Sequence, residues 1–66
     1  MTLSPLQREA LAWFAEVGAP VYRIPAKHGR NTLRSLTKRG LLTQVMPEVG
    51  MVAYVITPTG YREVLR

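Results

Sequence analysis

Cationic side chains recur every fourth residue in the stretch from Gly29 to Leu42, at Arg30, Arg34 and Lys38. In an α-helix, residues at this spacing lie on the same face, so the three cations would project together. An Arg guanidinium offers a planar set of donors that matches a phosphate or the O6 and N7 atoms of guanine. The pattern therefore indicates the binding of a polyanion.

The charges of the chain are segregated along its length. The 66 residues have a net charge of +5, and the four acidic residues are all Glu. No acid lies between Glu16 and Glu48, and the cations of that interval are Arg23, Lys27, Arg30, Arg34, Lys38 and Arg39. A field of one sign favours nucleic acid or an anionic membrane as partner. The alternative is a solvated basic face that only aids solubility.

Composition excludes several other classes of protein. With 47% hydrophobic and 20% charged residues, the chain is typical of one small globular domain. It has no Cys and a single His, His28, which we expect at the surface or in a loop, so neither a metal nor another cofactor is expected. No nucleotide loop or catalytic pattern is present, so no enzyme and no small-molecule substrate are predicted. Without a membrane span or signal peptide, we expect a cytoplasmic protein.

Local signals predict a first helix that begins after Ser4, is capped by that residue and ends at Gly18. Its apolar stripe consists of Leu6, Ala10, Trp13, Phe14 and Val17. Trp13 and Phe14 are interpreted as core residues rather than as a platform for stacked bases, because so small a domain needs their area.

The rest of the chain alternates short elements with Pro and Gly. An extended piece at 21–24 and one helical turn at 25–28 precede a helix at 30–39, in which Leu33 and Leu36 face inward. Strands at 41–45 and 51–56 flank a Pro/Gly turn and form a hairpin of uncertain register. Thr57-Pro58 begins a short last helix. Since just two leucines face inward, the basic helix is a weak membrane anchor, and no membrane is expected as partner.

Two passages carry a resemblance to a known fold. Residues 32–42, TLRSLTKRGLL, resemble the passage from recognition helix to wing in winged-helix regulators such as the MarR and PadR families, with the same Gly-Leu-Leu exit. Residues 54–60, YVITPTG, resemble their Y-x-L-T-P-x-G passage from the second wing strand to the next helix. The resemblance implies a single α+β winged-helix domain over residues 1–66, with three helices of which the second is shortened, a β-hairpin wing and a short C-terminal helix. Small phage-encoded proteins often share this sequence pattern.

The resemblance also implies a function, namely a small regulator that places the helix at 30–39 in the major groove of double-stranded DNA. A homodimer on a two-fold site is a reasonable expectation. For two of the candidate residues, a structural role is the alternative to DNA binding: Thr32 only caps the helix, and Arg39 only neutralises its C-terminal end. The candidate DNA-binding residues are Arg23, Lys27, Arg30, Asn31, Thr32, Arg34, Ser35, Lys38 and Arg39.

The predicted wing tip departs from the winged-helix pattern. Wings that enter the minor groove usually carry Arg or Lys at the tip, whereas this tip carries Glu48 and no cation. Its apolar residues Met46, Val49 and Met51 either form an interface with a protein partner or fold back onto the core. A second function therefore stays open, that of a winged-helix module that binds another protein through its wing.

Overall fold

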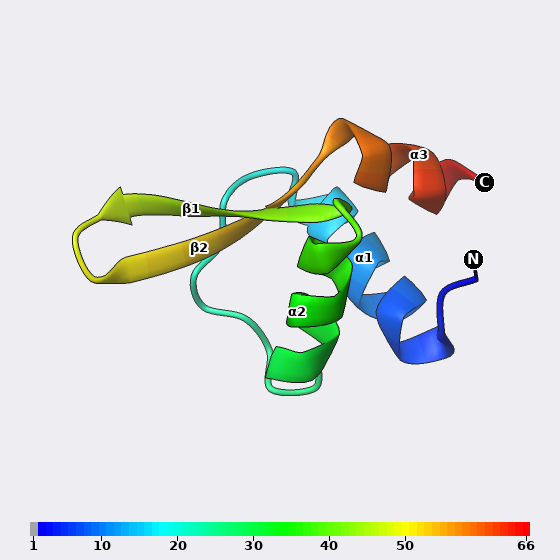
Figure 1. The fold of residues 1–66 in the computed structure, drawn as a ribbon, viewed down its shortest axis with the longest axis horizontal. Helices are drawn as coiled ribbons and strands as arrows, with labels where there is room; N and C mark the ends of the chain where they lie inside the picture. The colour runs from blue at the N-terminus through cyan, green and yellow to red at the C-terminus, as the bar shows by residue number, and fades with distance from the viewer. Residues whose placement is uncertain (1) are drawn as a thin grey trace.

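The computed structural model describes residues 2–66, and of Pro47 the backbone alone. It is an α+β structure of three helices and one antiparallel two-stranded hairpin, compatible with the layout of a winged helix. The hairpin projects away from the helices, and α3 lies on the side opposite the hairpin tip (Figure 1). Across residues 2–66, no helix combines the length and the apolar character that crossing a bilayer requires. The elements in order are α1 (Pro5–Val17), α2 (Arg30–Lys38), β1 (Leu42–Glu48), β2 (Met51–Ile56) and α3 (Pro58–Leu65).

Helix α1 begins and ends where local signals predicted. The Ser4 hydroxyl accepts a hydrogen bond from the Gln7 N–H at 3.2 Å, and the Gln7 side chain accepts one from the Ser4 N–H at 2.9 Å. This reciprocal capping box satisfies two backbone donors at the start of the helix. At the other end, Gly18 adopts a φ of 66° and its N–H donates to the Phe14 carbonyl.

Replacement of Ser4 by Ala is expected to lower the free energy of unfolding by about 1 kcal/mol, because the Gln7 N–H loses its acceptor. Urea denaturation of the two proteins measures the difference. The control is Ser4→Asp, which keeps an acceptor at this position and is expected to unfold near the wild-type midpoint. Equal midpoints for Ser4→Ala and the wild type would show that the cap contributes nothing.

The core lies between α1, α2 and the base of the hairpin. Ala10 and Phe14 are fully buried as predicted, and Trp13 is half-buried with its ring edge-on to that of Phe14. The stripe prediction was wrong for Leu6 and Val17, which are 62% and 42% exposed. The buried residues of this cluster are Leu3, Ala10, Leu11, Phe14, Leu33, Leu36, Leu41, Leu42 and Ile56.

Helical geometry explains that error. At 100° per residue, Leu11 lies about 60° to one side of Phe14, whereas Leu6 and Val17 lie about 60–80° to its other side. The buried face of α1 is centred on Ala10, Phe14 and Leu11, so Leu6 and Val17 are at its margin.

The segment between α1 and α2 contains the single turn that was predicted and corrects the placement of His28. The shortened second helix expected at residues 25–28 is a single turn, in which the His28 N–H donates to the Pro25 carbonyl at 3.0 Å. The turn is confined to the four residues 25–28, because Gly29 is already the N-cap of α2. His28 lies in this loop, which was one of the two predicted placements, but it is not at the surface, because it is 5% exposed and its ring lies 5.7 Å from that of Trp13. The imidazole therefore lies beside the indole ring.

Helix α2 ends one residue before the predicted Arg39. Gly40, with a φ of 77°, donates its N–H to the Thr37 carbonyl, and the Leu41 N–H donates to the Leu36 carbonyl. These two bonds form a Schellman motif, which satisfies the last carbonyls of the helix and reverses the chain. The buried Leu36 and Leu41 supply the apolar contact that accompanies this motif.

The hairpin is longer on its first strand than predicted. Strand β1 begins at Leu42 rather than Leu41 and runs to Glu48, so the connection is the two-residue turn Val49-Gly50, with Gly50 at a φ of 83°. The register shifts between Val45 and Glu48, where two residues of β1 oppose one of β2. A bulge at this point accommodates Pro47, which has no N–H to donate to the ladder. Pro47 therefore interrupts the pairing without ending the strand.

Candidate nucleic-acid interface

Helix α2 presents its charged residues on the side opposite its buried leucines. Leu33 and Leu36 are 6% and 0% exposed, and they fix the rotation of the helix about its axis. Arg30, Arg34 and Lys38, one turn apart, are all exposed. Asn31 is exposed as well, in the first turn of the helix. The four-residue spacing is thus translated into a row of side chains at the surface.

The hairpin makes this row one wall of a groove. Between α2 and the base of β1 and β2 lies a hollow of about 450 Å³. We call it the α2–hairpin groove. None of the described residues that line the groove is acidic, so its charge is wholly positive. Its lining consists of Arg30, Arg34, Thr37, Lys38, Gln44 and Tyr54.

Three of the lining residues are neutral and held by hydrogen bonds. The Thr37 hydroxyl donates to the Leu33 carbonyl one turn earlier, at 2.7 Å. The Gln44 side-chain amide donates to the Tyr54 hydroxyl at 2.9 Å, across a directly opposed pair of the hairpin. The hairpin wall of the groove is therefore polar but uncharged.

The cations of the groove are available to a ligand. Within residues 2–66, the ion pairs of the structure join Lys27 to Glu9 at 3.6 Å and Arg66 to Glu63 at 3.0 Å. Both pairs lie outside the groove, and neither uses a cation of α2. Since exposed pairs are weak, the Glu9 contact leaves Lys27 accessible to other anions.

Three predicted site residues of α2, Asn31, Thr32 and Ser35, do not line the groove. Ser35 is half-buried against α1, where its hydroxyl accepts a hydrogen bond from the Gln7 amide at 2.8 Å. Thr32 is also half-buried and does not cap the helix, because the N-cap is Gly29. The Ser35 hydroxyl therefore links α2 to α1, and this contact uses one of its acceptor lone pairs.

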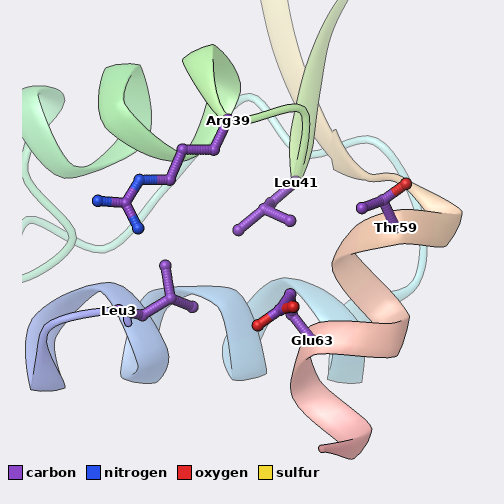
Figure 2. A pocket seen from close by; sticks show the side chains of 5 residues that line it. All are labelled: Leu3, Arg39, Leu41, Thr59 and Glu63. Atoms are coloured by element: carbon purple, nitrogen blue, oxygen red, sulfur yellow. The ribbon is translucent and has the colours of Figure 1, made fainter. Parts of the chain in front are cut away.

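Arg39 turns to another part of the molecule. Its side chain lies over a pocket between the start of α1 and α3, lined also by Leu3, Leu41, Thr59 and Glu63 (Figure 2). Its guanidinium donates to the Thr2 carbonyl at 3.5 Å. Arg39 is thus the C-cap residue of α2 and does not line the α2–hairpin groove.

Two predicted cations precede α2. Arg23 is exposed in the segment after Val21, and Lys27 is exposed in the turn before the helix. Neither lines the groove.

Two residues of the groove, Gln44 and Tyr54, were not predicted from the sequence, since their position depends on the pairing register of the hairpin. Gln44 and Tyr54 lie on the same face of the hairpin because they are directly opposed. Which residues are opposed depends on the pairing register, and the turn at Val49-Gly50 sets that register.

The hairpin tip is apolar and solvent-exposed. Met46 is 64% exposed and Val49 is fully exposed, so these two side chains do not fold back onto the core. Met51 is partly buried, and Val52 beside it is 45% exposed.

Comparison of the chain with models of protein families, with curated proteins and with solved structures finds no match. The geometry of the surface is therefore the basis on which a function is assigned.

Proposed function

We propose that this chain is a small winged-helix DNA-binding protein, a transcriptional regulator that places α2 in the major groove of double-stranded DNA. The observation that carries the proposal is the row Arg30, Arg34 and Lys38, exposed and without an acidic partner in the described part of the chain. A row of cations beside an acid-free groove matches the phosphates of a duplex.

The dimensions of α2 suit this role. From Arg30 to Lys38 the helix rises about 12 Å, and the major groove of B-DNA is about 12 Å wide. Arg30 and Asn31 lie at the N-terminal end of α2, where side chains of recognition helices contact base edges. Asn pairs with adenine and Arg with guanine. Lys38, in the last turn, is placed for the phosphate backbone.

The test is a salt titration of binding to a labelled duplex of about 20 base pairs, long enough for two half-sites one helical turn apart. With three cations at phosphates, log K is expected to fall with log salt concentration at a slope of about −3 or steeper. Selection from a randomised duplex pool is then expected to enrich a sequence motif. Absence of duplex binding by the folded protein at low salt would contradict the proposal.

The hairpin tip favours a second candidate function, the binding of another protein. Exposed Met46 and Val49 are the kind of side chains that protein interfaces bury. A folded protein that retains no duplex in the selection would favour this candidate. The two functions are compatible, because the tip and the α2–hairpin groove are separate surfaces. A homodimer on a two-fold site, which sedimentation with and without duplex would detect, remains part of the first proposal.

A further inference from the structure

The Tyr54 hydroxyl has a proton that its contact with Gln44 does not use. The Gln44 amide nitrogen donates to the Tyr54 oxygen at 2.9 Å, so the phenol is the acceptor in this bond. A phenol carries one proton and can donate as well as accept. Because the Gln44 amide donates to a lone pair of the Tyr54 oxygen, the O–H of Tyr54 is directed away from Gln44. Both side chains line the α2–hairpin groove, so the groove offers a neutral donor on its hairpin wall.

The position of that donor is fixed by the backbone and by packing. The Tyr54 N–H and carbonyl both pair with Val21, each at 2.9 Å. The phenol ring is partly buried and packs against the hydrophobic core. Tyr54 is therefore held between Val21 on one side and Gln44 of β1 on the other. A donor held in this way loses little conformational entropy when it binds a ligand.

The groove offers both charged and neutral donors. Arg30, Arg34 and Lys38 supply positive charge from α2, and Tyr54 supplies a neutral O–H from β2. The Thr37 hydroxyl already donates to the Leu33 carbonyl, so its proton does not point into the groove. A matching ligand must carry negative charge and several acceptor oxygens, which describes a phosphodiester.

We propose that a backbone phosphate of the bound duplex enters the α2–hairpin groove and accepts a hydrogen bond from the Tyr54 hydroxyl, with Gln44 as the residue that orients this hydroxyl. This inference rests on the proposed function. It assigns the hairpin's DNA contact to its base, through a neutral donor, rather than to its cation-free tip. Gln44 is thus a positioning residue, and Tyr54 is the contact.

A neutral donor and a cation have different signatures in a salt titration. A cation that neutralises a phosphate releases counterions, so its loss reduces the slope of log K against log salt concentration by about one. Loss of a neutral donor weakens binding without a change in that slope. Tyr54→Phe, which keeps the ring and its packing, is therefore expected to weaken duplex binding about three- to tenfold at every salt concentration.

The orienting role of Gln44 is tested by a double-mutant cycle. Gln44→Met, similar in shape and without a donor, is expected to weaken binding in the wild-type background and to change nothing in the Tyr54→Phe background. The control is Tyr22→Phe, which removes an exposed hydroxyl outside the groove and is expected to bind like the wild type. Circular dichroism melting of each variant verifies that binding is measured on folded protein. Gln44 is exposed, so its variant provides the test even if Tyr54→Phe were to melt early.

The outcomes separate this inference from the proposed function. If the wild type binds duplex with a steep salt slope and Tyr54→Phe binds equally well, the phosphate contact is wrong and the proposed function stands. A slope that decreases in Tyr54→Phe would also overturn it, because the variant would then have disturbed the cations. Additive effects of the two substitutions would overturn the role of Gln44. Absence of wild-type binding would remove the proposed function itself.

Discussion

The double variant Arg34→Ala/Lys38→Ala is expected to bind duplex DNA about 30- to 100-fold more weakly than the wild type at about 0.1 M salt. The physical reason is counterion release, since two cations that would each neutralise a phosphate are lost. The slope of log K against log salt concentration is accordingly expected to decrease in magnitude by about two. Fluorescence anisotropy with a labelled duplex, repeated over a range of salt concentrations, measures both quantities.

A control with the same net charge separates the position of the cations from their number. Arg8→Ala/Arg62→Ala also changes the net charge from +5 to +3, but it removes exposed cations of α1 and α3, outside the groove. This control is expected to retain most of the wild-type affinity. Arg34 and Lys38 are exposed and form no ion pair within residues 2–66, so the melting temperature of the test variant should stay close to that of the wild type. Equal losses in both double variants would mean that binding follows net charge alone.

The ends of the helices were predictable because they depend on local chemistry. Ser4 accepts from the backbone of its own first turn, and Thr57 accepts from the Gly60 N–H in the same way. Gly18 and Gly40 adopt the left-handed conformation that ends a helix. Such interactions link residues three to five positions apart, so a short stretch of sequence contains all of their partners.

Two of the errors arose where residues outside the local pattern decide the structure. His28 is buried and lies beside Trp13, fifteen positions earlier, and no local pattern contains that contact. The length of β1 depends on a bulge that accommodates Pro47, whereas the local signal of a proline is the end of a strand. The periodicity of the cations placed Arg30, Arg34 and Lys38 on one face of α2. The opposite wall of the groove, Gln44 and Tyr54, depends on the pairing register of the hairpin. This register is difficult to predict from sequence, because a bulge shifts it between Val45 and Glu48.

Gly60 belongs to a short local motif, but tertiary packing is what requires a glycine at this position. It occupies the third position of α3 in the Thr-Pro-Thr-Gly stretch and is buried. A Cβ atom at this position would lie 2.3 Å from the Leu41 carbonyl oxygen and 2.7 Å from Cγ1 of Ile56. The same carbonyl accepts from the Thr57 N–H at 3.0 Å and from the Thr57 hydroxyl at 3.1 Å. The start of α3 is therefore packed directly on the corner that ends α2.

Gly60→Ala is expected to lower the free energy of unfolding by about 2–3 kcal/mol and the melting temperature by about 10–20 °C. In an exposed helix the same change would stabilise by about 1 kcal/mol, because Ala has the higher helix propensity. Here the added methyl group must push α3 away from Leu41, which also lengthens the two hydrogen bonds from Thr57 to the Leu41 carbonyl. Thermal unfolding followed by circular dichroism measures the shift.

Gly29→Ala is the matched control. It makes the same chemical change at the N-cap of α2, where a Cβ atom would have nothing within 4 Å and φ is −65°. Its cost is expected to stay below about 1 kcal/mol. A melting temperature of Gly60→Ala equal to or above that of Gly29→Ala would mean that α3 can move from the corner at little cost. The close packing of α3 on Leu41 would then not be what requires glycine at position 60.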